Sequence, residues 1–346
     1  MLTKDNYTLE HINELRKYRN TDTFILERSI YAFGLLEALC KVKMPFIFKG
    51  GTSLMLLLEH PRRLSTDVDI IVSPGTDVES YLKKVEKIFP FEKVVQQERI
   101  GKNGIAKKHY KFYYKSPVKS DTLFYILLDI LFEENHYARI VSKPIKNDLL
   151  NTQGEDLEVV LPSVDCILGD KLTAFAPHTT GIPLGIGKEL EIIKQMYDVA
   201  ALIDVFDDFE DVYNSYMAIV ETEINYRGLD ISANEVLMDT IDTAACIAGR
   251  GQIGSEYPMY LAGIKSISTH IYDERYSAEK AVLSACKTMY LAACTLRKSN
   301  FEKVIDCNLY LDRNIGKSNY SKLSKLRKFN AEAFSYVVKT MELLEK

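Results

Sequence analysis

Two carboxylates stand two positions apart in a short apolar stretch, at Asp67 and Asp69. The aliphatic residues between and after them are typical of a strand, and side chains two positions apart in a strand lie on the same face. Two parallel carboxylates repel each other unless a cation lies between them, and Mg²⁺ prefers oxygen ligands of this kind. The pair therefore indicates a metal site on one face of a sheet.

A third acid, Asp129, lies inside another apolar run, Leu-Leu-Asp-Ile-Leu. A carboxylate in so apolar a strand needs a partner or a metal ion. If this strand lies beside the strand of Asp67 and Asp69, three carboxylates converge. They could then hold two metal ions that flank an in-line phosphoryl displacement, one activating the attacking hydroxyl and one on a triphosphate.

A glycine corner precedes these acids. A short β-type run leads into Gly50 and Gly51, and helix-forming residues follow from Thr52. Without Cβ atoms at the turn, backbone N–H groups can approach a ligand as large as a polyphosphate. Thr52 and Ser53 fall in the first helical turn, where a hydroxyl can bond a phosphate oxygen or cap the helix. Each motif alone is common, but the joint pattern favours a metal–nucleotide site over a structural turn with an edge acid pair.

The elements that position these residues follow from hydrophobic periodicity. We predict helices at residues 9–19, 23–41, 52–60 and 77–89, and strands at residues 46–48, 68–72, 91–100, 106–115 and 123–132. The glycines of residues 101–104 predict a hairpin turn. From residue 163 onward helical periodicity dominates and no strand is predicted.

These elements predict an α+β protein. Residues 1–160 would form an N-terminal domain with a mixed β-sheet and flanking helices, including the helices of residues 1–42, and residues 161–346 an all-helical domain. We place the boundary near residues 155–162, where Gly154 and Pro162 interrupt the pattern.

Composition bounds the class of protein. The chain has 346 residues, of which 47% are hydrophobic and 27% charged, as in an ordinary globular protein rather than a disordered or fibrous one. Its apolar runs are far shorter than the roughly 18 residues that span a bilayer, and its first residues lack the core of a signal peptide. We therefore expect a cytoplasmic protein. The six cysteines include no Cys-x-x-Cys pair, which argues against a zinc cage or a disulfide framework.

Charge is distributed unevenly, although the net charge is only −4. Residues 99–119 hold seven basic residues and no acid, residues 200–242 hold eleven acids and one arginine, and residues 297–346 hold eleven basic and six acidic residues. Such a chain can present a basic groove to a phosphate-rich partner. The alternative for each run is a solvated face.

The basic run contains a strand with interleaved aromatic residues. Alternation puts Tyr110, Phe112 and Tyr114 on one face, and Lys111, Tyr113 and Lys115 on the other. Aromatic rings beside lysines can stack on bases and neutralise phosphates. We therefore expect RNA contacts from lysines of this strand, with an ordinary half-buried strand as the alternative; the lysines are Lys108, Lys111 and Lys115.

The glycine corner and the acids resemble the nucleotidyltransferase superfamily of the DNA polymerase β type and, more narrowly, the AbiEii/AbiGii toxin family of type IV toxin–antitoxin and abortive-infection systems. Residues 50–54 match the first family motif, and residues 63–70 match its Arg-x-Ser-x-Asp-x-Asp. Residues 170–174 are similar to its Lys-Leu-x-Ala segment, and residues 194–198, Lys-Gln-Met-Tyr-Asp, to its Arg-Asp-x-Tyr-Asp. The resemblance covers about residues 45–205.

The resemblance implies roles for individual residues. Asp67, Asp69 and Asp129 would be metal ligands, Lys171 would contact nucleotide phosphates, and Asp198 would act in catalysis or base positioning. Gly50, Gly51, Thr52 and Ser53 would bind the nucleotide. The alternatives are a solvated Lys171 and a local pair of Asp198 with Lys194.

The implied activity is a Mg²⁺-dependent transfer, with Mn²⁺ as a substitute, of a nucleoside monophosphate from an NTP to a hydroxyl. GTP or CTP would be the substrate and RNA, at a tRNA 3′ end, the acceptor. The protein would be a bacteriostatic toxin with a separately encoded antitoxin that acts indirectly, and neither a membrane nor DNA is expected as a partner. Two alternatives remain: the same chemistry on a small-molecule or protein hydroxyl, and a non-catalytic nucleotide-binding protein.

Overall fold

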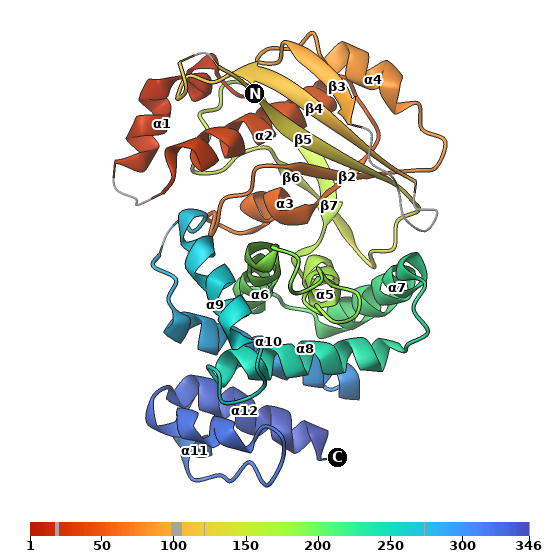
Figure 1. Ribbon diagram of the computed structural model, residues 1–346. Coiled ribbons are helices and arrows are strands. Elements are labelled where there is room, and N and C mark those ends of the chain that lie inside the picture. Colours follow the sequence, from red (N-terminus) through yellow and green to blue (C-terminus); the bar gives the residue numbers. More distant parts are fainter. Residues whose placement is uncertain (18–20, 98–105, 121, 273, 346) are drawn as a thin grey trace. The chain divides into compact units, whose positions relative to one another are not determined.

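The computed structural model describes residues 1–17, 21–97, 106–120, 122–272 and 274–345. The chain forms two compact units (Figure 1). The sheet unit comprises Met1–Ser163 and Thr269–Glu274, and the helical unit comprises Val164–Ser268 and Arg275–Lys346. The α+β class is thereby confirmed. The division into an α/β domain of residues 1–160 and a helical domain of residues 161–346 stays a prediction.

In the described part of the sheet unit, the main sheet has five strands. Their spatial order is β1 (Ile47–Lys49), β2 (Val68–Val72), β5 (Leu123–Phe132), β4 (Lys107–Lys115) and β3 (Lys93–Gln97). The pair β2 and β5 is parallel and the other pairs are antiparallel, so the sheet is mixed as expected. The predicted hairpin turn at residues 101–104 lies outside the described residues.

Helix α2 (Thr23–Lys41) covers one face of this sheet, packing against β5 and β2 (Figure 1). It begins at Asp22, whose carboxylate accepts from the backbone N–H groups of Phe24 and Ile25. The ring of Tyr31 on this helix stacks on that of Tyr114 with centroids 3.7 Å apart. The remaining helices of the unit are η1 (Lys4–Tyr7), α1 (Leu9–Arg16), α3 (Gly50–Leu57) and α4 (Val78–Val85).

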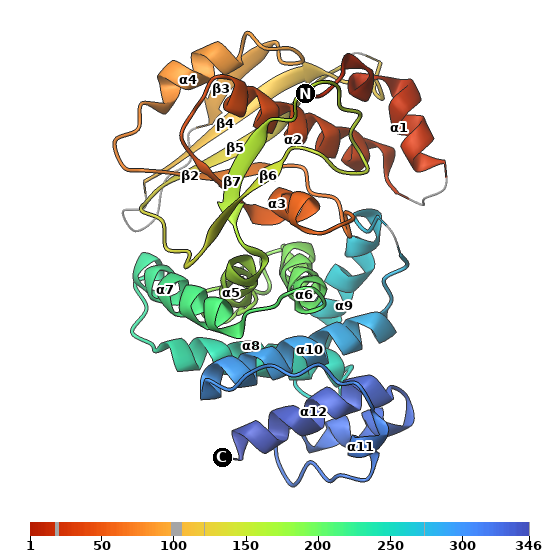
Figure 2. The same ribbon diagram turned by 180° about the vertical axis from the view of Figure 1, so that it is seen from behind.

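A second, antiparallel ladder joins β6 (Ile140–Pro144) to β7 (Glu158–Pro162), and β7 lies next to β1 (Figure 2). The sequence analysis predicted neither strand. Burial along β6 only alternates between exposed and half-buried, and its Ser-Lys-Pro end is weakly β-forming, so no hydrophobic run marks it.

The helical unit contains no strand in its described residues, as predicted. Its α-helices are α5 (Val164–Ala174), α6 (Glu189–Ile203), α7 (Phe209–Arg227), α8 (Ala233–Ala248), α9 (Tyr257–Ser266), α10 (Ala278–Arg297), α11 (Asn308–Leu311) and α12 (Ala331–Leu344). The unit also has the 3₁₀ helices η2 (Ile267–Thr269) and η3 (Ser321–Lys328). The last residue of η2, Thr269, belongs to the sheet unit. Helix α10 packs against α6, α8 and α12. Side-chain caps at Asp208, Ser232 and Ser277 fix where α7, α8 and α10 begin. Among the described helices, none has the length and apolar character needed to cross a membrane.

Candidate active site

A row of polar residues crosses the main sheet, one from each strand. In strand order it runs through Lys49, Asp69, Asp129, His109 and Gln97, which are paired in register. Residues paired in this way place their side chains on the same face of a sheet. The other face is apolar and buried, with Ile70, Ile130 and Phe112 at most 1% exposed. The row therefore lies on the face opposite α2.

Asp69 and Asp129 are direct neighbours in this row, on the parallel strands β2 and β5. The expectation that the Asp129 strand lies beside the Asp-x-Asp strand is therefore correct. Asp67 precedes β2, and its Oδ1 lies 3.2 Å from an Nη2 nitrogen of Arg28 on α2. The sheet brings Asp69 and Asp129 together. Asp67 lies two residues before Asp69 in the sequence and forms an ion pair with Arg28.

His109 is the partner of the half-buried Asp129. Its Nδ1 lies 2.6 Å from Oδ1 of Asp129, and the two side chains are 15% and 31% exposed. The sequence analysis did not select His109 or Arg28. Alternation could have placed His109 on the face of Lys111, but only the register of β4 against β5 sets it opposite Asp129.

Gly50 lies directly against the Asp69 carboxylate. Its φ is +81°, in the region that favours glycine, and a Cβ there would lie 2.0 Å from Oδ2 of Asp69. Helix α3 begins at Gly50, two residues before the predicted start at Thr52. The glycine thus belongs to the first helical turn, and its missing side chain makes room for the acid.

Gly51 has a similar relation to the start of the Arg-x-Ser-x-Asp-x-Asp motif. A Cβ at Gly51 would lie 2.8 Å from both a guanidinium nitrogen of Arg63 and the hydroxyl of Ser65. Arg63 is buried and donates to the carbonyl of Leu64 at 3.2 Å. These two motif residues therefore pack on the glycine turn.

The hydroxyls of Thr52 and Ser53 bond within the protein. Thr52 donates to the carbonyl of Asp67 at 2.5 Å, Ser53 donates to the carbonyl of Gly50 at 2.8 Å, and both residues are 0% exposed. Neither hydroxyl caps α3, and the role of Thr52 and Ser53 in binding the nucleotide stays a prediction. Backbone N–H groups at the start of a helix can also bind a phosphate.

The donor set suits Mg²⁺ in kind, because it consists of carboxylates on adjacent strands. Among the residues that the structure describes, no group of three or more His, Cys, Asp or Glu side chains is arranged to hold a metal ion. The metal-ligand role of Asp67, Asp69 and Asp129 stays a prediction.

In the helical unit, Lys171 and Asp198 form a buried ion pair. The ammonium of Lys171 on α5 lies 3.0 Å from Oδ2 of Asp198 on α6, and it donates to Oε1 of Gln195 at 2.9 Å. Lys171 is therefore not solvated, and Lys194 pairs with Glu191 at 2.9 Å. The two resemblance-derived residues act as one unit.

Residues 35–267 match the family model described as "Nucleotidyl transferase AbiEii toxin, Type IV TA system". The chain belongs to the AbiEii nucleotidyltransferase toxin family. This match includes the glycine corner, the three acids of the sheet unit and the Lys171–Asp198 pair, and it confirms the resemblance.

Other comparisons add little beyond the family. Among solved structures, the chain is similar to an antigenic nucleotidyltransferase-like protein from Paracoccidioides brasiliensis, with 14% identity, a TM-score of 0.36, and coverage of 59% of this chain and 93% of that one. No protein with a curated description matches the sequence.

The residues of the basic strand of this AbiEii-family chain alternate between the two faces of the sheet, as predicted. Lys111 lies on the face of the polar row, with its ammonium 4.3 Å from the Tyr125 ring centroid. Lys115 is exposed and lies 3.0 Å from a Glu92 carboxylate oxygen. Lys108 has the opposite parity and pairs with Glu79 on α4. It therefore lies on the other face of the strand from Lys111 and Lys115, and the RNA contacts of the three lysines stay a prediction.

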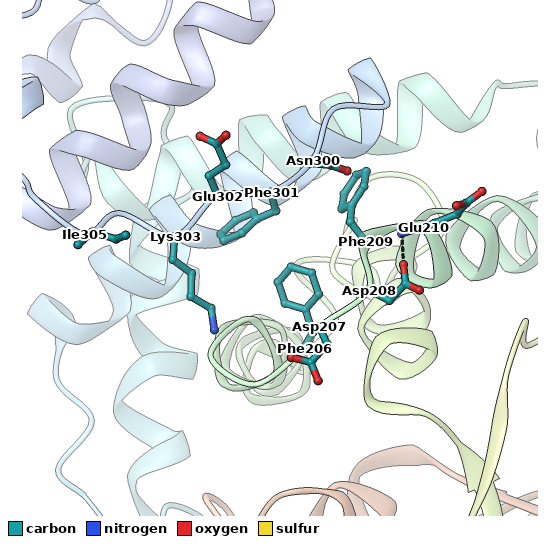
Figure 3. Close-up of a pocket in the computed structure, with 10 residues that line it drawn as sticks. All are labelled: Phe206, Asp207, Asp208, Phe209, Glu210, Asn300, Phe301, Glu302, Lys303 and Ile305. Atoms are coloured by element: carbon teal, nitrogen blue, oxygen red, sulfur yellow. Dashed lines mark hydrogen bonds between the residues drawn. The ribbon is translucent and has the colours of Figure 1, made fainter.

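A large cavity of about 790 Å³ lies in the helical unit, between the start of α7 and the chain after α10 (Figure 3). Phenylalanine rings and acids face it, together with one lysine; the residues are Phe206, Asp207, Asp208, Phe209, Glu210, Asn300, Phe301, Glu302, Lys303 and Ile305. The ammonium of Lys339 pairs with Glu302 at 2.9 Å, which leaves three carboxylates against one ammonium, and this balance repels a polyphosphate. This cavity is therefore not a candidate NTP site.

Proposed function

We propose that this AbiEii-family protein is a Mg²⁺-dependent nucleotidyltransferase that moves a nucleoside monophosphate from an NTP to a hydroxyl of RNA. The acceptor we propose is a tRNA 3′ end, and the modification makes the protein a bacteriostatic toxin. The observation that carries the proposal is the register of Asp69 beside Asp129, with Gly50 packed on Asp69.

The carboxylates of Asp69 and Asp129, with Asp67, would hold Mg²⁺ or Mn²⁺. The ion supplies charge stabilisation to phosphate oxygens when it is bound. His109 fixes the orientation of the Asp129 carboxylate through the 2.6 Å contact. Arg28 does the same for Asp67.

Binding of the nucleotide falls to two groups. The N–H groups of Gly50 and Gly51 open α3, where the helix dipole favours an anion. Lys171 contacts phosphates, and Asp198 holds its ammonium in place, because the pair is buried at 3.0 Å. The NTP would be GTP or CTP, and a separately encoded antitoxin would act indirectly.

The test incubates the protein with Mg²⁺, each α-labelled NTP and total RNA. We expect label on RNA that RNase releases, and no transfer by Asp67→Asn or Asp69→Asn. Asp77→Asn is the matched control, because Asp77 caps α4 and asparagine also caps helices well. Label that survives RNase would move the acceptor to a protein or small molecule. Transfer by both site variants at the rate of the control would contradict the catalytic role.

A further inference from the structure

A basic surface covers the C-terminal part of the helical unit. Residues 313–331 contain six basic residues and no acidic residue. Four of the six lie in the 3₁₀ helix η3, where Leu323 and Leu326 face inward and are 1% and 9% exposed. We call this the η3 basic surface; its residues are Arg250, Lys322, Lys325, Lys328 and Phe329.

The helix type aligns three of the lysines. A 3₁₀ helix has three residues per turn, so Lys322, Lys325 and Lys328 lie one above another. With a rise of about 2.0 Å per residue, their Cα atoms follow at intervals of about 6 Å. That interval is on the scale of the separation of successive phosphates along a nucleic-acid strand.

The surface borders a concavity with an exposed aromatic ring. A cavity of about 330 Å³ lies between the end of α8, the start of α10 and η3, and Arg250, Lys322 and Lys325 line it. Phe329 also lines it and is 83% exposed. An exposed ring beside aligned lysines is the combination that binds unpaired bases and their phosphates.

The three aligned lysines are not neutralised by acidic side chains of the described chain. Lys325 donates to the neutral side chain of Gln252 at 2.8 Å. Within the described chain, no carboxylate forms an ion pair with Lys322, Lys325 or Lys328, whereas Arg250 lies 3.3 Å from a Glu279 oxygen. The net charge of the surface therefore remains positive.

We propose that the η3 basic surface binds a single-stranded segment of the RNA acceptor. Lys322, Lys325 and Lys328 contact successive phosphates, and an unpaired base stacks on Phe329. The choice of RNA rests on the proposed function; the phosphate and base contacts rest on the surface itself. The surface serves acceptor binding, not the transfer step.

The experiment measures binding of a labelled, mixed-sequence single-stranded RNA by fluorescence anisotropy, using the Asp69→Asn background without NTP. Replacing Lys322, Lys325 and Lys328 by alanine should weaken binding at least tenfold. It should also reduce the magnitude of the negative slope of log affinity against log salt by about 2, since each single-strand phosphate contact contributes about −0.7 to that slope. Phe329→Ala should weaken binding about tenfold and Phe329→Tyr should restore it, because a tyrosine ring also stacks.

The control removes the same charge elsewhere, by alanine at the exposed residues Lys87, Lys146 and Lys265. Equal loss in this control, or wild-type affinity in the η3 triple variant, overturns the proposal. Equal competition by DNA of the same sequence overturns the assignment to RNA. If the η3 triple variant transfers label to RNA with an unchanged KM for RNA, the role of the η3 basic surface is overturned and the proposed activity stands. If the wild type transfers no label but still binds RNA through the η3 basic surface, only the proposed activity is overturned.

Discussion

Replacing Gly50 by alanine tests whether the glycine corner exists to admit Asp69. The new Cβ would lie 2.0 Å from Oδ2 of Asp69, 2.7 Å from its Cγ and 2.9 Å from its Cβ. Ordinary contact begins at 3.4 Å, so the carboxylate oxygen must retreat by 1.4 Å, the difference between the two distances. Because three atoms of the side chain are too close, a small torsional adjustment does not relieve the clash.

Two effects of the substitution can be separated by magnitude. The φ of +81° costs an alanine about 1–2 kcal/mol relative to glycine, which lowers the free energy of unfolding. The displacement of Asp69 acts on the reaction instead, and a shift of about 1 Å in a reacting geometry can cost about 10²-fold in rate. We therefore expect a modest loss of stability and about a hundredfold loss of NMP transfer.

Gly75→Ala is the control. Gly75 has a φ of +85°, and a Cβ there would meet nothing within 4 Å. Both variants should shift the thermal midpoint by a similar few degrees. Labelled transfer should fall only in Gly50→Ala. Transfer rates within a few-fold of each other in the two variants would refute the packing of Gly50 on Asp69 as a requirement for activity.

Two further predictions concern the helical unit. Burial opposes the charged form of His178, but the hydrogen bonds that its ring nitrogens donate to the carboxylates of Asp239 and Glu256 outweigh it and raise the pKa of His178. The stability that His178 adds should be complete below its unfolded pKa of about 6.5 and should be lost as pH rises through the raised folded pKa. The measurement compares the urea midpoints of wild type and His178→Gln from pH 5.5 to 9. A difference between the two midpoints that stays constant over this range would contradict the prediction. Lys171→Met should lower the free energy of unfolding by about 3–5 kcal/mol, because the buried carboxylate of Asp198 then loses the ammonium that lies 3.0 Å from it. Adding Asp198→Leu should restore part of that loss in urea unfolding, and additive losses would argue against the pair.

The sequence predicts the strands of the site well, because their patterns are strong and local. Residues 68–72 and 123–132 form strands with the expected bounds. Alternation along the basic strand correctly separates buried Tyr110 from half-buried Lys111. These features depend on periodicity over a few neighbours, which a single chain displays directly.

Features that depend on register between distant segments could not be predicted. His109 faces Asp129 only because β4 pairs with β5 at that offset, and a slip of one residue would turn it to the other face. Arg28 pairs with Asp67 across 39 positions. Lys108 and Lys111 lie on opposite faces of β4, as strand alternation dictates, and their contacts with RNA stay a prediction.

The glycine pair and the Arg-x-Ser-x-Asp-x-Asp motif form one structural unit, although they look like separate signals in the sequence. Gly50 leaves room for Asp69, and Gly51 leaves room for Arg63 and Ser65. A loss of nucleotide binding after a glycine substitution therefore cannot be assigned to lost phosphate contacts, because the acid moves as well. A measurement of nucleotide affinity without divalent ions distinguishes the two causes. Under that condition, the glycine substitution should lower the affinity only if the N–H groups of the turn contact the phosphates.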